Sequence, residues 1–135
     1  MRAALALREA VFCDEQGVPR ELEVDGLDPV ARHLVAVDEP GGEVVGTLRL
    51  LRDGDTAKVG RVAVRRSWRR RGVASRMLEM AVERAQGEGC TRARLAAQMQ
   101  ATEVYAGVGF AVESEPFQEA GIEHVWMGRE LHRRD

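Results

Sequence analysis

The stretch from Ala57 to Gln86 constrains the fold more than any other part of the chain. It begins with the apolar run AKVGRVAV, continues with the basic loop RRSWRRRG, and ends with VASRMLEMAVERAQ. The first run is typical of a strand, and the apolar residues of the last recur at helical intervals. A strand, a loop ending in glycine and an amphipathic helix together predict a β-loop-α unit.

The segments before this unit predict a small antiparallel sheet behind an N-terminal helix. Two runs rich in β-branched residues, 33–38 and 43–52, are joined to each other and to the unit by short turns. Short turns between such runs indicate an antiparallel meander. Upstream, the pattern predicts a helix from Arg2 to about Asp14. An acidic loop follows, from Gln16 to Pro29.

The segments after the unit complete an α/β order around one mixed sheet. We expect a strand over 91–98 and a short helix within 101–110, which ends at two glycines. Two final strands are predicted over 110–117 and 123–131, separated by a turn. No repeat or linker interrupts the sequence, so its 135 residues predict one domain, 1–135.

Composition excludes several classes of function. The net charge of −2 disfavours nucleic acid as a partner. No apolar run reaches the roughly 20 residues that cross a bilayer, so no membrane partner is expected. The N-terminus reads as an amphipathic helix and not as a signal peptide. Cys13 and Cys90 lack the spacing of a metal site, which predicts reduced thiols, no metal and a cytoplasmic location.

The junction between the basic loop and the helix predicts an anion site. The first backbone N–H groups of a helix have no internal partner, and the helix dipole is positive there. Gly72 and the small Ala74 allow a phosphate to approach the backbone, and three consecutive arginines end at Arg71. On the loop alone, a solvated arginine cluster, an RNA contact and an ordinary loop glycine remain alternatives.

Two spaced motifs resemble the signatures of one family. The pattern RxxGxA at 69–74 is similar to the Gln/Arg-x-x-Gly-x-Gly/Ala signature of the GNAT N-acetyltransferase superfamily. Farther along, QxxAxxxYxxxGF at 98–110 is similar to the second signature of that superfamily. Both motifs occur in the expected order and context, and the likeness covers about Arg32 to Phe110.

Further segments resemble the ElaA-like branch of this superfamily. These are VFxxEQxVP at 11–19, the acidic loop, and GIxHxxM at 121–127. The chain departs from the family at its start, because relatives have a strand before the first helix and this sequence begins at the helix. Either the start is truncated or that strand is missing. Many relatives carry a glutamate on the strand before the basic loop, where this chain reads GRV at 60–62. Gln98 replaces the usual asparagine.

The resemblance implies a fold, a reaction and a cosubstrate. The fold is a single-domain mixed, mostly antiparallel sheet flanked by helices, with the first strand missing. The reaction is transfer of an acetyl group from acetyl-CoA to an amine of a small molecule, without a metal. The pantetheine arm would lie along the strand before the loop, and the pyrophosphate would lie at the helix start. The implied cofactor-binding residues are Val62, Ala63, Val64, Arg69, Arg70, Arg71, Gly72, Val73, Ala74, Ser75 and Gln98.

The resemblance also implies catalytic residues. Tyr105 stands at the family's position for the acid that protonates the leaving thiolate. A phenol has a pKa of about 10 and a thiol of this kind a pKa of about 8.5. Transfer of the proton from the phenol to the thiolate is therefore uphill by about 1.5 units, or roughly 2 kcal/mol. On the acceptor side we name His124 and Glu15, with the rest of the acidic loop facing a cationic amine. Packing of Tyr105, a structural role for His124 and a merely solvated loop are the alternatives.

Other functions remain open at this point. A catalytically silent acyl-CoA-binding regulatory module would keep the anion site but would not need Tyr105. An RNA-binding protein would use Arg65 to Arg71, but the chain lacks stacking aromatics beyond Trp68 and the required charge. The sequence is also compatible with a homodimer.

Overall fold

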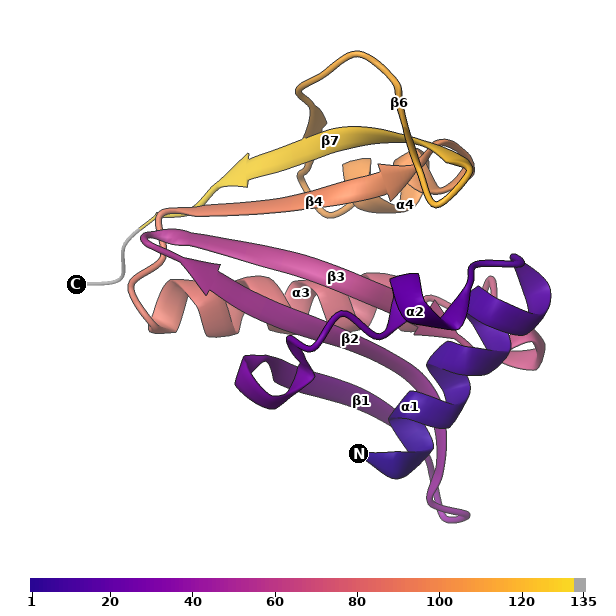
Figure 1. Cartoon of the computed structure of the whole chain (residues 1–135). Helices are drawn as coiled ribbons and strands as arrows, with labels where there is room; N and C mark the ends of the chain where they lie inside the picture. Colours follow the sequence, from indigo (N-terminus) through magenta and orange to yellow (C-terminus); the bar gives the residue numbers. More distant parts are fainter. Residues whose placement is uncertain (133–135) are drawn as a thin grey trace.

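The computed structural model describes residues 1–132 and is built around one seven-stranded sheet (Figure 1). The strands lie in the order β1-β2-β3-β4-β7-β5, and β6 also pairs with β7. Their bounds are β1 Arg32–Asp38, β2 Glu43–Asp53, β3 Thr56–Val64, β4 Arg92–Gln98, β5 Ala111–Val112, β6 Phe117–Glu119 and β7 Ile122–Glu130.

The sheet has the predicted mixed, mostly antiparallel topology. β1, β2 and β3 form an antiparallel meander, and β4 pairs antiparallel with β7. In the described part of the chain, β3 and β4 are the one parallel pair, and the helix of the β-loop-α unit connects them. The prediction of a single strand over 110–117 is wrong. The structure has two short strands here, β5 and β6, which pair with different parts of β7. Pro116 and the bend before it separate the two pieces.

Within residues 1–132, four α-helices accompany the sheet: α1 Arg2–Arg8, α2 Arg20–Glu23, α3 Val73–Gly87 and α4 Thr102–Ala106. The helix predicted from Arg2 is confirmed, but its second half, Glu9–Glu15, is wound as a π-helix. The acidic loop is more ordered than the sequence predicts, because α2 and a 3₁₀ turn, Asp28–Val30, lie within it.

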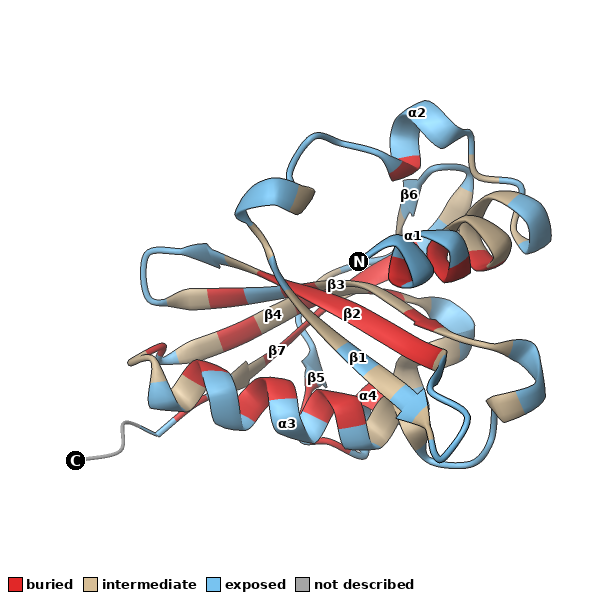
Figure 2. Cartoon of the chain, turned by 90° about the horizontal axis from the view of Figure 1, so that it is seen from below, coloured by how far each residue is buried: buried red, intermediate tan, exposed pale blue. Residues whose placement is uncertain are grey.

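α3 covers one face of the sheet and α1 covers the other (Figure 2). Apolar residues of α3 such as Leu78 and Ala81 are fully buried against β2, β3 and β4. A Cβ on Gly46 of β2 would lie 2.9 Å from the side chains of both Val73 and Met77. Glycine at this position therefore lets the first turn of α3 approach the sheet. A smaller cluster around Leu7, Val11 and Ala63 attaches the N-terminal helix to the opposite face.

Candidate active site

A cleft opens where the two parallel strands separate. β3 and β4 pair only from Thr56 to Val59 and from Arg92 to Leu95, and beyond these residues they diverge (Figure 1). The cleft has a volume of about 1140 Å³ and is lined by both strands, β7, the start of α3 and the N-terminal helical segments. A volume of this size accommodates a large ligand. Most of the predicted site residues line it: Val62, Ala63, Val64, Arg69, Arg70, Gly72, Val73, Ala74, Ser75, Gln98, Tyr105 and His124.

A bulge bends β3 at the mouth of the cleft. Thr47 of β2 pairs with Ala63, whereas Arg49, two residues on, pairs with Gly60, so β3 carries one extra residue between them. Arg61 takes up the extra residue with a φ of 51°, in the left-handed region. Bulges of this kind re-aim side chains and end regular pairing. Here the bulge lies where β3 parts from β4.

The start of α3 presents free backbone donors to the cleft. The first helical hydrogen bond runs from the Arg76 N–H to the Gly72 carbonyl, so the N–H groups of Val73, Ala74 and Ser75 have no helical acceptor. Gly72 has a φ of 78°, and the position of a Cβ on it is open space. Glycine therefore supports the left-handed turn and leaves room beside the donors. This arrangement suits a phosphate group.

The three arginines of the basic loop have different surroundings. Arg69 donates a hydrogen bond from Nε to the Val64 carbonyl at 3.0 Å, and its Nη2 lies 2.9 Å from Glu15. The guanidinium of Arg71 stacks on Trp68 at 4.8 Å and does not line the cleft. Arg70 is exposed, lines the cleft and has no ion-pair partner among residues 1–132. Arg70 is therefore the arginine best able to reach a phosphate, while Arg69 supports the loop.

Tyr105, on α4, forms part of the wall of the cleft and is 9% exposed. Its ring packs edge-on against Phe110. No protein group within the described residues hydrogen-bonds its hydroxyl, and burial raises the pKa of Tyr105 to about 12. A full proton transfer to a thiolate of pKa about 8.5 is therefore uphill by about 3.5 units, or about 4.8 kcal/mol. This exceeds the roughly 2 kcal/mol expected for an unperturbed phenol.

Three glutamines connect the two sides of the cleft. Gln98 at the end of β4 and Gln16 after the π-helix exchange amide hydrogen bonds of 2.9 and 3.3 Å. Gln100 also donates to the Gln98 oxygen at 2.6 Å. Gln98 was predicted as a cofactor ligand, and the structure shows it holding the N-terminal segment against β4.

His124 lies on β7 directly opposite Gln98 and is buried. Its Nδ1 is 2.7 Å from the Ile122 carbonyl, which only accepts hydrogen bonds, so Nδ1 carries the proton in the neutral ring. Nε2 then has a free lone pair, and Glu119 of β6 lies 3.8 Å from it. The ring also stacks on Phe117. This arrangement gives His124 the geometry of a base with a carboxylate beside it.

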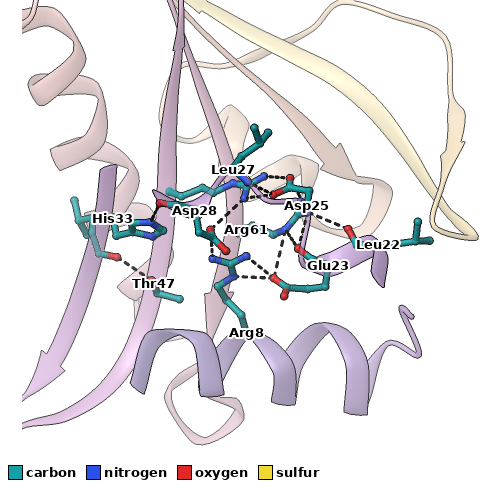
Figure 3. A network of polar contacts seen from close by, with 11 residues as sticks. Arg8, Leu22, Glu23, Asp25, Leu27, Asp28, His33, Thr47 and Arg61 are labelled. Carbon is teal, nitrogen blue, oxygen red and sulfur yellow. Dashed lines mark hydrogen bonds and ion pairs between the residues drawn. The ribbon is translucent and has the colours of Figure 1, made fainter. Parts of the chain in front are cut away.

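Arginines of the fold engage most carboxylates of the acidic loop (Figure 3). Arg8 of α1, 1% exposed, donates a 2.7 Å hydrogen bond from Nε to Glu23 and another from Nη1 to Asp28. Asp28 also accepts a hydrogen bond from Arg49 of β2 at 3.2 Å. Arg49 pairs in turn with Asp25.

The same network extends to the bulge on β3. Arg61 lies 3.4 Å from Glu23 and 3.3 Å from Asp25. Hydrogen bonds from Arg49 hold the pKa of Asp25 well below its usual range. Burial alone would raise the pKa of Asp28, but its bonds to Arg8 and Arg49 lower it overall. The sequence predicts that these three carboxylates face a cationic amine; in the structure their charges are balanced by Arg8, Arg49 and Arg61, and Glu23 and Asp25 line the cleft.

The structure does not bring Glu15 into the cleft with His124. Its carboxylate pairs with Arg69 and does not line the cleft. Glu119 falls in the turn that the sequence predicts between the last two strands, so the sequence does not mark it as a site residue. The two-residue turn Ala120–Gly121 was the available signal, because it fixes the register that brings Glu119 back beside His124.

Within residues 1–132 no cluster of His, Cys, Asp and Glu able to hold a metal is found, and no helix is long and apolar enough to cross a membrane.

Comparisons with known proteins agree with this architecture. The model of the acetyltransferase (GNAT) domain matches residues 6–131. An uncharacterized N-acetyltransferase of Bacillus subtilis, YjcF, is 35% identical over 94% of this chain and 90% of its own length. An acyl-CoA N-acyltransferase from Pseudomonas aeruginosa is 33% identical with a TM-score of 0.83, covering 94% of this chain and 88% of that one.

The expected branch of the family is also confirmed. Escherichia coli ElaA is 30% identical with a TM-score of 0.85, and the match covers 96% of this chain and 89% of ElaA. The domain match, the two signatures and the cleft between β3 and β4 agree with one another. The chain therefore belongs to the GNAT family of acetyltransferases.

Proposed function

We propose that the protein transfers an acetyl group from acetyl-CoA to the amine of a small molecule. The observation that carries this proposal is the continuity of the cleft. One cleft joins the free N–H groups at the start of α3 to Tyr105 and His124. An anion site at one end and proton-handling groups at the other match the two halves of an acetyl transfer from a phosphorylated cosubstrate. The similar acyl-CoA N-acyltransferase of P. aeruginosa supports the same reaction.

The residues of this chain fit acetyl-CoA, which would supply a thioester carbonyl for the amine to attack. The N–H groups of Val73, Ala74 and Ser75 would hold the pyrophosphate, because they have no helical acceptor and Gly72 leaves open space beside them. Arg70 would add a positive charge. The edge of β3 that faces the cleft is unpaired beyond Val59, so its backbone would hold the pantetheine arm as an added strand does.

His124 would accept the proton of the attacking amine. An alkyl ammonium of pKa about 10.4 costs about 4.6 kcal/mol to deprotonate at pH 7, which is enough to require a base. β3 offers no carboxylate at 60–62, and the carboxylates of Glu23 and Asp25 are engaged by arginines. His124 has its Nε2 free, lines the cleft, and has Glu119 at 3.8 Å to stabilise the ring once charged.

Tyr105 would stabilise the departing thiolate mainly by donating a hydrogen bond. Since its pKa is about 12, a complete transfer of the proton is less favourable than donation without transfer. A hydrogen bond to a charged acceptor is worth about 1.5–3 kcal/mol, which is a useful contribution to the transition state. Tyr105 therefore remains protonated at every pH at which the reaction is run.

The test is a screen of primary amines with thiol release as the readout and product mass as confirmation. We expect amine-dependent thiol release with a product heavier by one acetyl group. With the best amine, His124→Ala should lower kcat by about 10²–10⁴-fold, the usual contribution of a general base. His132→Ala is the matched control, because His132 is exposed and lies outside the cleft. Tight acetyl-CoA binding without acetylation of any amine would favour a silent acyl-CoA-binding module instead.

A further inference from the structure

Two cations face each other on the floor of the cleft. Lys58 of β3 pairs in register with Arg94 of β4, and both line the cleft. Ala57 and Val59, their neighbours on β3, are buried in the core beside α3. Because side chains alternate across a sheet, Lys58 and Arg94 project from the opposite, open face. Like charges on directly opposed residues destabilise a sheet unless something compensates them.

The positive charges of Lys58 and Arg94 are only partly compensated by carboxylates of the protein. Lys58 lies 3.5 Å from Asp53, and both side chains are largely exposed to water, so this pair contributes little. The shortest distance from Arg94 to Glu113 is 3.5 Å, from Nε, and Glu113 is shared with Arg92. Neither Nη atom of Arg94 donates a hydrogen bond to a group among residues 1–132, although the guanidinium as a whole is ion-paired with Glu113. The fork of this guanidinium is therefore available for a ligand.

The guanidinium of Arg94 is held toward the catalytic end of the cleft. It lies 4.3 Å from the ring centre of Trp126, whose backbone pairs with Ala96. The next pair along the same face of the sheet is Gln98 with His124. Two residues of strand span roughly 7 Å and four span roughly 13 Å. Measured along the strands, the nearest cationic group, the guanidinium of Arg94, therefore lies about 7 Å from His124.

The negative charge that faces these cations lies beside His124. Glu119, 58% exposed, lies 3.8 Å from the Nε2 of His124 and lines the cleft. The other acidic residues lining the cleft, Glu23 and Asp25, are balanced by the buried arginines. Where this face lines the cleft, it therefore presents one carboxylate that no arginine engages, beside the base, and the positive charges of Lys58 and Arg94 farther along the strands.

We infer that the acceptor is zwitterionic: an amine that also carries a carboxylate about 7–13 Å away. The ammonium end would lie at Glu119 and His124, and the carboxylate would bind Arg94 with Lys58 beside it. An arginine fork binds a carboxylate with two parallel hydrogen bonds, which gives direction as well as strength. This inference rests on the proposed function, because it assigns the acceptor of the same cleft.

The experiment compares three amines of one chain length, δ-aminovalerate, δ-aminovaleramide and pentylamine, against the chain saturated with CoA. Binding is followed by the fluorescence of Trp126, with Trp68→Phe removing the other tryptophan. We expect δ-aminovalerate to bind at least about 10-fold tighter than either neutral-ended amine, the value of one charged hydrogen bond. In Arg94→Gln this preference should fall to within about twofold, and in Lys58→Gln it should fall partly.

The matched control is Arg84→Gln, an exposed arginine of α3 on the other side of the sheet, which should keep the full preference. Equal affinity for the three amines in the wild type, or a preference that survives in Arg94→Gln, would overturn the inference. So would the absence of δ-aminovalerate binding up to millimolar concentrations. Because binding is measured without turnover, selective binding without acetylation would refute the proposed function and leave this assignment of the ligand standing.

Discussion

Replacing Arg8 with methionine removes the central cation of the network that holds the loop between the first helix and β1. Arg8 is 1% exposed and pairs with Glu23 at 2.6 Å and Asp28 at 2.7 Å. Methionine keeps most of the aliphatic length and removes the charge. Glu23, itself buried, would be left with Arg61 at 3.4 Å, and Asp28 with Arg49 at 3.2 Å.

The expected loss follows from these remaining contacts. Removing one partner of a buried ion pair costs about 3–5 kcal/mol, because a buried charge is left uncompensated. Both carboxylates keep a second arginine, so we expect the lower end, about 3 kcal/mol, which corresponds to a fall in Tm of roughly 10 °C for a chain of this size.

Urea unfolding followed by circular dichroism measures this change. Arg20→Met is the matched control, because Arg20 pairs with Glu9 on the surface, with both side chains largely exposed, and should cost less than about 1 kcal/mol. Adding Glu23→Leu to Arg8→Met should cost clearly less than the sum of the two single changes, since no unpaired charge remains. Equal, small losses in Arg8→Met and Arg20→Met would refute the view that the network is a buried structural unit.

Three further predictions concern titration and turnover. The folded-state pKa values of Asp25 and Asp28 lie below their unfolded values, so their contribution to stability is complete above about pH 4 and is lost as the pH falls further; urea midpoints that do not fall between pH 5 and pH 3 would contradict this. Tyr105 is the only tyrosine, so ultraviolet absorbance should show tyrosinate forming near pH 12 in the folded chain and near pH 10 in urea; a folded midpoint near 10 would show that the ring is not buried. With an acceptor in hand, Tyr105→Phe should lower kcat by about 10–100-fold, the value of one charged hydrogen bond, and unchanged kcat would exclude the role.

The order of the elements could be predicted because each follows from local pattern. The β-branched runs of β1 to β3, the short turns between them and the helical spacing after Gly72 all lie within windows of a few residues. The helix start with Gly72, where we propose that the pyrophosphate binds, was predictable for the same reason, since it is a local feature. The break between β5 and β6 was missed because each piece is too short to show a periodicity.

The surroundings of the proposed acceptor site depend on contacts between distant residues, which the sequence predicts less well. The acidic loop is a run of carboxylates in the sequence, but its partners Arg8, Arg49 and Arg61 come from three different elements. Likewise, Lys58 and Arg94 lie opposite each other because of the register of two parallel strands, although the two residues are 36 positions apart in the chain. Charge patterns along a sequence do not reveal such pairings.

Calorimetric titration of acetyl-CoA into the wild type and Gly72→Glu tests the central claim most directly. Glutamate at Gly72 puts a negative charge beside the free N–H groups of α3, in space that is open in the structure. Gly54→Glu is the control, because Gly54 has a left-handed φ of 60° in a turn outside the cleft and imposes a similar backbone cost. We predict that the wild type and Gly54→Glu bind acetyl-CoA, while Gly72→Glu remains folded and shows no binding. Equal affinity in all three proteins would contradict the assignment of this cleft to acetyl-CoA.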